Sequence, residues 1–338
     1  MPLSVILAPD SFKGSITARD AAAAIARGWS TARPDDAIAL LPQADGGEGT
    51  LDAVEAAVAG ARRRWLGGVT GPDGAAVDAS WLSLPDGTAV VELAQSSGLP
   101  LMRTLDPLGA TTRGLGEVIR AVLATSPRRL LVGLGGSAST DGGLGVLGAV
   151  PTVDVEVVLL TDVTAPLLGP TGAAAVFAPQ KGASPAQVVE LEQRLAELAQ
   201  RLGGDPQAEG AGAAGGTAYG LATAWGARIV SGSEHIAALT GLDAAMSEAD
   251  AAVTGEGRFD AQSLGGKTVG RVLDSASRHA VPCALIAGEL GADYTGYAVS
   301  LSALAGSAEA SMTDAVGWLE SAGAQTARSV ERWARRIS

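Results

Sequence analysis

The chain has 338 residues, and its 36 acidic and 24 basic side chains give a formal net charge of −12. This length fits two α/β domains, or one domain with a large insertion. The negative charge argues against a nucleic-acid partner, because the phosphate backbone would be repelled, and the single cysteine, Cys283, excludes an intrachain disulfide and a cysteine-based zinc site.

The N-terminal sequence MPLSVILAPD has no basic flank, and its apolar run is too short for a signal peptide. No segment approaches the stretch of about 18 apolar residues that marks a transmembrane helix. A lone cysteine also suits a reducing compartment. We therefore expect a cytoplasmic protein without a membrane partner, either a monomer or a homodimer.

Short apolar runs recur at residues 3–8, 37–41, 129–132 and 251–253. Each is followed by a loop with Gly or Asp and then by an Ala-rich helical pattern. This alternation is typical of parallel βα units, whose C-terminal loops line the sheet edge where open α/β sheets bind ligands.

Three helix starts carry capping sequences: Thr17 with Asp20, Ser184 before Pro185, and Ser311 with Asp314. The second predicts a helix over 185–202 that glycines 203 and 204 end. The pattern around Trp318, Leu319, Val330 and Trp333 has helical spacing and predicts a buried stripe.

Residues 62–94 look different, because turn sequences at 71–74 and 85–87 separate several strands and predict a meander. Residues 153–229 combine a strand, a long polar helix and a glycine-rich stretch. We predict a flavodoxin- or Rossmann-like parallel-sheet domain with a second α/β domain inserted in it. The predicted borders are 1–60, 109–150 and 240–338 for the first domain, and 61–108 and 151–239 for the second.

Lysine is rare in this chain: of the 24 basic residues, only Lys13, Lys181 and Lys267 are lysines. Arginine supplies the ordinary surface charge of this chain, so the presence of lysine at these three positions needs another explanation. A compact, mobile charge suits a phosphate whose geometry changes during transfer. The alternative is that they are three leftover surface lysines.

Acidic residues gather in the same Gly-rich loops, at Asp10, Asp45, Glu48, Asp141, Asp162, Glu256 and Asp260. Kinases use carboxylates to hold Mg²⁺ and to accept the proton of the substrate hydroxyl. Any single one of them can instead be a turn former or a helix cap.

Two standard phosphate motifs are incomplete. Gly133-x-Gly135-x-x-Ala138, with Asp154 beyond it, fits the dinucleotide fingerprint of an NAD(P)-dependent oxidoreductase, but the glycines at 142 and 143 would interrupt its helix. The segment 265–268 resembles the end of a Walker A loop, yet Ala261 stands where the first glycine is required. His235 and His279 have no nucleophile or metal-spaced partner.

Five ordered motifs together resemble the bacterial type I glycerate kinase family: APDSFKGSITA (8–18), ADGGEGT (44–50), GGSASTDGGLG (135–145), GAAAVFAPQKGAS (172–184) and TGEGRFDAQSLGGKT (254–268). The resemblance implies ATP- and Mg²⁺-dependent phosphorylation of D-glycerate, giving 2-phosphoglycerate in preference to 3-phosphoglycerate. It also implies a flavodoxin-like domain with an inserted second domain.

Within this resemblance we assign roles as hypotheses. Lys13 and Lys267 neutralise the ATP phosphates. The loop that cradles them comprises Gly135, Gly136, Ser137, Ser139, Thr140, Gly142 and Gly143. Asp10 and Asp141 are the candidates for Mg²⁺, and Asp45 or Asp162 for the group that accepts the hydroxyl proton. Substrate-binding candidates are Ser11, Lys181 and Arg258, with the Arg258 fork suited to the glycerate carboxylate and Lys181 able to serve either end.

The chain departs from the family pattern at two places. The family usually has Cys-Asp-Val-x-Asn-Pro-Leu where this chain has Thr161 to Leu167, so Ala165 replaces an amide while Asp162 is kept. The segment between residues 145 and 161 is also shorter than the family leads us to expect, by a few tens of residues. A shortened paralogue that binds a nucleotide or a sugar acid without turnover is therefore the alternative.

Overall fold

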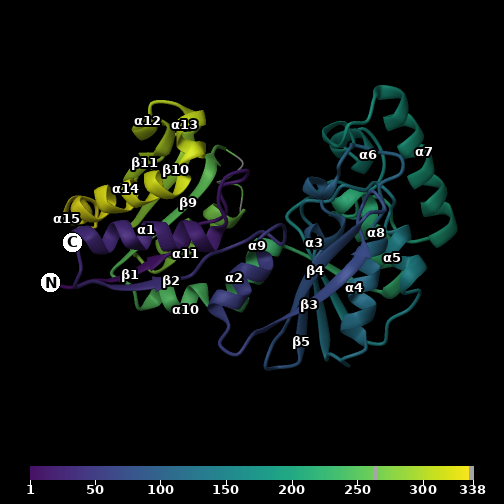
Figure 1. The fold of residues 1–338 in the computed structure, drawn as a ribbon, viewed down its shortest axis with the longest axis horizontal. Helices are drawn as coiled ribbons and strands as arrows, with labels where there is room; N and C mark the ends of the chain where they lie inside the picture. The colour runs from purple at the N-terminus through teal and green to yellow at the C-terminus, as the bar shows by residue number, and fades with distance from the viewer. Residues whose placement is uncertain (262, 264, 266, 335–338) are drawn as a thin grey trace. The chain divides into compact units, whose positions relative to one another are not determined.

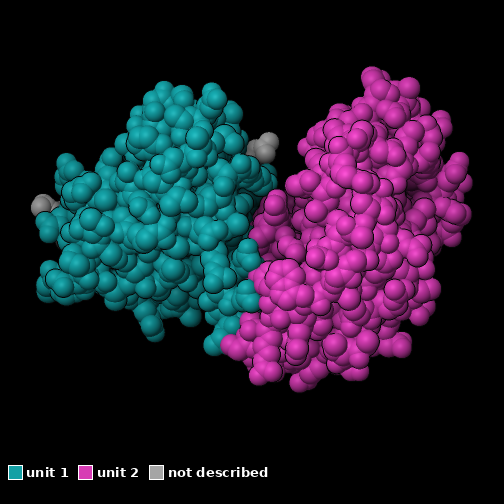
Figure 2. All heavy atoms as spheres, in the orientation of Figure 1, with its two compact units in different colours: residues 1–44, 52–59, 233–338 teal, residues 45–51, 60–232 magenta. Residues whose placement is uncertain are grey.

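The computed structural model describes residues 1–261, 263, 265 and 267–334, and the chain divides into two compact units (Figures 1 and 2). Unit 1 consists of Met1–Ala44, Asp52–Ala59 and Ser233–Ser338, and unit 2 of Asp45–Leu51 and Gly60–Gly232. No helix in the described part of the chain is both long and apolar enough to span a membrane.

Unit 1 is built on a five-stranded sheet in the order β11-β10-β9-β1-β2, and all of its strand pairs are parallel. Counted along the chain, the strands lie in the flavodoxin-like order 2-1-3-4-5. The strands and the helices wholly within this unit are β1 (Ser4–Leu7), α1 (Ala18–Ala32), β2 (Ala37–Leu40), α10 (Leu242–Ser247), β9 (Ala251–Phe259), α11 (Thr268–Arg278), β10 (Cys283–Leu290), β11 (Ala298–Ser300), α12 (Leu301–Ala305), α13 (Ala308–Thr313), α14 (Ala315–Arg328) and α15 (Val330–Trp333). Helices α2 (Thr50–Ala57) and α9 (Gly232–Thr240) begin with residues of unit 2 and continue in unit 1.

Alternate side chains of β1 bury themselves on opposite faces of this sheet. Val5 and Leu7 belong to a core shared with α1 and α14, whereas Ile6 and Ala8 belong to a core shared with α10 and α11. Strands buried on both faces are expected in a parallel sheet covered by helices. The predicted parallel βα architecture is thus confirmed for this unit.

Helices α1 and α14 approach closely, as Figure 1 shows, because small residues face each other. A Cβ at Gly28 would overlap the carbonyl oxygen of Glu320, and one at Gly323 would overlap that of Ile25. The predicted C-terminal stripe is confirmed, since Leu319 and Val330 are buried in this core and the two neighbouring tryptophans pack against it.

Unit 2 carries a six-stranded mixed sheet in the order β3-β4-β5-β6-β7-β8, in which the pairs from β5 to β8 are parallel. One face packs against α4, α5 and α8. Its elements are β3 (Arg62–Thr70), β4 (Ala76–Ser83), β5 (Thr88–Glu92), α3 (Ala94–Ser97), the 3₁₀ turn η1 (Leu99–Leu101), α4 (Arg113–Leu123), β6 (Arg129–Gly133), α5 (Leu144–Ala149), β7 (Glu156–Leu160), α6 (Ala173–Phe177), the 3₁₀ turn η2 (Pro179–Lys181), α7 (Pro185–Leu202), α8 (Ala213–Trp225) and β8 (Arg228–Val230).

The predicted meander is confirmed as the antiparallel strands β3, β4 and β5. Gly74 and Gly87 take the left-handed conformations that their turns require, with φ of 82° and 85°. The predicted long helix is α7: Ser184 and Gln187 form a reciprocal capping box and Gly203 ends the helix.

One capping prediction is wrong. Ser311 and Asp314 do not cap the same helix, because Ser311 lies inside α13 while Asp314 caps α14 by accepting a hydrogen bond from Gly317 N. The pair has the right spacing, but a helix ends between its members.

The division of the chain also differs from the predicted borders. Residues 109–150 belong to unit 2, because β6 hydrogen-bonds to β5 on one side and β7 on the other. Residues 45–51 belong to unit 2 as well, and residues 233–239 to unit 1.

Candidate active site

The strand order of unit 1 reverses between β1 and β9, so the loops after these two strands form the usual ligand position of such a sheet. The loop after β1 runs beside β9, where Asp10 N donates to Gly255 O at 2.8 Å. Asp10 and Ser11 are partly exposed, and Oδ1 of Asp10 accepts a hydrogen bond from Ser11 N at 2.6 Å. Lys13 lies exposed in the same loop.

The carboxyl end of β9 brings further charges to the same place. Burial raises the pKa of Glu256, and the nearby Asp260 carboxylate raises it further. A hydrogen bond from Ser263 and the charges of Lys267 and Lys13 act in the opposite direction, so the two predicted lysines lie near this carboxylate. Within the described residues, the buried Oε1 of Glu256 has no hydrogen-bond partner.

Arg258 lies exposed on β9, where Nη1 is 3.6 Å from a carboxylate oxygen of Glu289 on the adjacent strand β10. Lys267 is exposed at the N-cap position of α11. The motif 254–268 contains three residues, at 262, 264 and 266, that lie outside the described part of the chain.

In unit 2, the glycine-rich loop after β6 is closely packed. Gly135 N donates to Gly46 O at 3.2 Å, and a Cβ at Gly135 would overlap the backbone of Gly47. Ser137 and Ser139 are buried and share a hydrogen bond between their hydroxyls at 3.2 Å. Thr140 is also buried, at 4% exposed, but its hydroxyl has no hydrogen-bond partner within the described residues.

Asp141 holds this loop to its surroundings through four hydrogen bonds. Its Oδ2 accepts from the N and Oγ1 of Thr112 at 2.9 and 2.8 Å and from Gly145 N at 3.2 Å, and its Oδ1 accepts from Gly143 N at 3.0 Å. The carboxylate thereby ties the starts of α4 and α5 together.

Gly142 and Gly143 have left-handed φ values of 63° and 78°. A side chain at Gly142 would overlap Leu198 of α7, and one at Gly143 would press on Thr217 of α8. These two glycines are therefore explained by backbone conformation and helix packing, independently of any ligand.

Asp45 and Asp162 both lie near the carboxyl edge of the unit 2 sheet. Oδ1 of Asp45 accepts from Gly47 N at 2.9 Å, and the adjacent Gly46 packs on Leu160, the last residue of β7. Asp162 follows β7 by two residues, and its Oδ1 accepts from Ser231 Oγ at 2.8 Å.

Lys181 ends the 3₁₀ turn η2 and is only 3% exposed. Its ammonium donates to the carbonyl of Ser139. Burial lowers the pKa of this lysine to about 8, although the charge of Asp141 opposes the shift. The structure thus places it beneath the loop that follows β6.

Two carboxylates on strands received no role in the predicted sites. Glu256 was noted only as one of the acidic residues of the Gly-rich loops, and the structure places it within β9. Glu92 ends β5, is 2% exposed, and its oxygens accept from Gly49 N and Leu51 N at 3.1 and 3.2 Å at the start of α2. Nothing in the sequence distinguished its role from that of an ordinary strand-end carboxylate.

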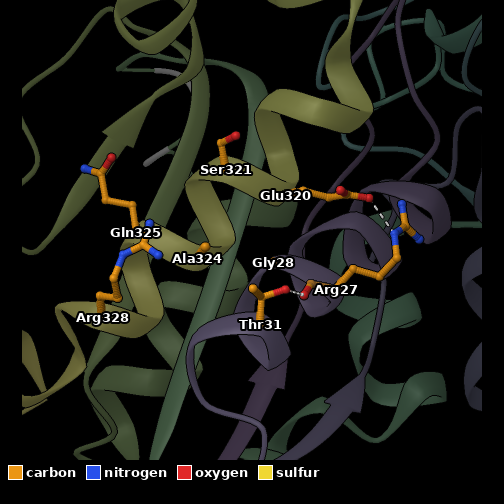
Figure 3. Close-up of a pocket in the computed structure, with 8 residues that line it drawn as sticks. All are labelled: Arg27, Gly28, Thr31, Glu320, Ser321, Ala324, Gln325 and Arg328. Carbon is orange, nitrogen blue, oxygen red and sulfur yellow. Dashed lines mark hydrogen bonds and ion pairs between the residues drawn. The ribbon is translucent and has the colours of Figure 1, made fainter.

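A groove of about 630 Å³ lies between α1 and α14 of unit 1 (Figure 3). Figure 3 shows Arg27 pointing to Glu320, with Nε 2.6 Å from the carboxylate. No predicted site residue lines this groove, so it is separate from the residues discussed above. Within the described residues, no group of three or more His, Cys, Asp or Glu side chains could hold a metal ion.

Comparison with known proteins identifies the family to which these residues belong. The profile of the glycerate kinase family matches residues 5–153 and 150–338. The chain belongs to the glycerate kinase family. The two segments that match the glycerate kinase family overlap at residues 150–153, in the connection between α5 and β7.

Similar proteins include a glycerate 2-kinase of Escherichia coli, 37% identical over 85% of this chain and 86% of its own length. A glycerate kinase of Bacillus subtilis is also 37% identical, over 86% of each chain. An uncharacterized Mycobacterium bovis protein is 41% identical over 96% of this chain and 91% of its own. The crystal structure of a Salmonella typhimurium LT2 protein assigned as glycerate kinase 2 superposes with a TM-score of 0.81 and 32% identity, covering 98% of this chain and 99% of that one.

Proposed function

We propose that this chain transfers the γ-phosphoryl group of ATP to the 2-hydroxyl of D-glycerate, giving 2-phosphoglycerate and ADP. The observation that carries the proposal is the match of the glycerate kinase family over nearly the whole chain. The charged loops after β1 and β9 support it, because phosphoryl transfer depends mostly on positioning and charge stabilisation.

In unit 1, Lys13 and Lys267 would neutralise the phosphates of ATP. Arg258 and Ser11 would bind glycerate, with the planar guanidinium of Arg258 matching its carboxylate. Lys267 and Arg258 are exposed in this unit and need no rearrangement of the core to reach a ligand.

In unit 2, the backbone of the 135–143 loop and the Thr140 hydroxyl would bind phosphate oxygens. Asp45 or Asp162 would accept the proton that the glycerate hydroxyl loses as its oxygen bonds to phosphorus. The bond between the γ-phosphorus and the bridging oxygen breaks in the same displacement, and ADP leaves with that oxygen.

The residues of the loop after β1 fit a Mg²⁺ ion better than Asp141 does. Mg²⁺ prefers carboxylate, phosphate and water oxygens. Asp10 is partly exposed in the loop after β1, and its backbone N donates to Gly255 O of β9, whereas the Asp141 carboxylate accepts four hydrogen bonds that tie the loop to the starts of α4 and α5. We therefore propose Asp10 as a Mg²⁺-binding residue and a loop-holding role for Asp141; bound Mg²⁺ would offset the negative charge of the phosphates.

The test is the release of ADP from Mg-ATP by the purified protein, with and without D-glycerate, followed by ³¹P NMR of the product. We expect release that depends on D-glycerate and a 2-phospho product. Lys267→Ala should lower kcat/KM by about 10²- to 10³-fold, as for loss of one charge-stabilising donor, with little change in Tm. The matched control is Arg271→Ala on the same helix, whose ion pair with Glu234 is exposed.

A second candidate function follows from the segment between residues 145 and 161, which is shorter than the family pattern leads us to expect, and it is a non-catalytic paralogue that binds a nucleotide or a sugar acid. It predicts that ATP or glycerate raises Tm while no ADP is released. The dinucleotide alternative has less support, because the helix after β6 begins only at Leu144, after two left-handed glycines. If NAD(H) does not bind to the purified protein, the oxidoreductase alternative is excluded.

A further inference from the structure

Lys181 has a charged side chain that is buried, and burying a charge has a free-energy cost. It is 3% exposed, and a buried ammonium is costly unless a specific partner compensates for the lost hydration. The partner in this structure is the Ser139 carbonyl, in the loop after β6. An exposed lysine would serve equally well for surface charge, so this burial indicates a role within unit 2.

The Ser139 carbonyl is a point where several parts of unit 2 meet. The carbonyl also accepts a hydrogen bond from Ser137 Oγ at 3.3 Å, and the Ser137 Oγ in turn accepts one from Ser139 N at 3.2 Å. On its other side, a Cβ at Gly215 would overlap this carbonyl. The loop is thereby confined between η2 and the start of α8.

The start of α8 has an unusual backbone. Ala214, Gly215 and Gly216 take left-handed φ values of 52°, 63° and 85° in succession, and this is unfavourable for alanine. The Gly215 carbonyl accepts Gly142 N at 3.0 Å. The strained turn thus gives the second half of the loop a fixed attachment, as Lys181 does for the first half.

Thr140 lies between these two attachments, and its side chain is more than nine-tenths buried. Its hydroxyl has no hydrogen-bond partner in the described part of the chain. A buried hydroxyl without a partner is costly, and a ligand oxygen would satisfy it.

We propose that Lys181 is a positioning residue, which holds the Ser139 carbonyl and so fixes the 135–142 loop with the Thr140 hydroxyl ready for a phosphate oxygen. This inference rests on the proposed function, which assigns the loop to the phosphates of ATP. It replaces the direct contact with substrate that the sequence had suggested for Lys181. Gly215 is the corresponding positioning residue on the opposite side of the loop.

The test is Lys181→Met, which keeps the length of the side chain but removes its donors. We expect faster hydrogen–deuterium exchange of residues 137–142 in the ligand-free protein, a readout that loss of a direct ligand contact would not change. The Kd for Mg-ATP from calorimetry should rise by about tenfold or more, equivalent to ~1.4 kcal/mol, while KM for D-glycerate stays within about twofold. Lys181→Leu, which also removes the donors, takes its place if the Met variant does not fold.

Gly215→Ala should reproduce both effects, because it displaces the same carbonyl from the other side. The matched control is Tyr219→Phe, which removes the partly buried hydrogen bond from the Tyr219 hydroxyl to the Gly203 carbonyl within the same unit. It should lower Tm without a selective rise in exchange at 137–142.

Four outcomes separate this inference from the proposed function. If the wild-type protein turns over glycerate and Lys181→Met matches it in exchange and in Kd for ATP, the inference alone is overturned. A rise in KM for D-glycerate with unchanged loop exchange would also overturn it, in favour of direct substrate contact. If the wild-type protein binds ATP without turnover, the proposed function fails and the binding and exchange measurements still decide the role of Lys181; if it binds no nucleotide, both are overturned.

Discussion

Asp141 has the most constrained surroundings of the predicted site residues, and they lead to a prediction about stability. Asp141→Asn keeps the shape of the side chain but replaces an acceptor oxygen by an NH₂ group that would face N–H or O–H donors. Because hydrogen bonds to charged groups are the stronger ones, we expect the variant to lower the free energy of unfolding of unit 2 by about 2 kcal/mol. Urea unfolding measures this change.

The control for Asp141→Asn is Asp205→Asn in the same unit, where the carboxylate accepts an exposed hydrogen bond from Gln207 N at 2.9 Å. It should change stability by less than about 0.5 kcal/mol, as most surface substitutions do. If Asp141→Asn unfolds like the wild type while the Mg²⁺ dependence of ADP release changes, the aspartate binds the metal and does not hold the loop.

Residue types and their loops could be predicted from the sequence, but the direction of each side chain could not. The scarcity of lysine singled out Lys181, yet only the packing of η2 under the loop shows that its ammonium reaches a backbone carbonyl. The sequence offered a turn-forming or capping role for each loop aspartate, but Asp141 accepts a hydrogen bond from Thr112, a residue 29 positions away. Such a long-range partner leaves no local signal.

At the scale of elements, the contact between α1 and α14 depends on Gly28. Gly28→Ala would place a methyl group against the Glu320 carbonyl, and because the clash is with backbone atoms, one helix must move. We expect a loss of about 1–3 kcal/mol, typical of overpacking. The matched control is Gly148→Ala in α5, where a Cβ meets nothing within 4 Å, and helix propensity should stabilise the protein by about 0.5–1 kcal/mol. Equal effects of the two variants on Tm would contradict this account.

Elements with local signals were predicted well. Helix α7 begins at a capping box and ends at a glycine, and the turns of the meander contain glycines that favour positive φ. The pair Ser311 and Asp314 shows the limit, because its spacing is local but the break between α13 and α14 is not marked by Gly or Pro. The left-handed start of α8 had no signal beyond its glycines, since Ala214 disfavours that conformation.

At the scale of the whole molecule, the βα pattern predicted the fold class but not the sheet to which each strand belongs. The run at 129–132 looks like those at 3–8 and 251–253, yet it pairs with β5 and β7 in unit 2. Parallel strands pair through long crossovers, so a strand's neighbours are set by contacts that are distant in sequence. The borders at 109–150 could therefore not be read from local patterns.

Each unit has its own sheet and its own hydrophobic cores, and this predicts the thermal unfolding of the whole chain. Domains with separate cores can unfold separately, in which case a single two-state transition no longer describes the protein. We expect two calorimetric transitions, with Gly28→Ala lowering the Tm of one and Asp141→Asn that of the other, because these residues lie in different units. ATP should raise the transition that Asp141→Asn lowers and also the other one, since the proposed phosphate loop lies in unit 2 while Lys13 and Lys267, which we propose neutralise the phosphates, lie in unit 1. A single transition that both variants shift by similar amounts would show instead that the two cores unfold cooperatively.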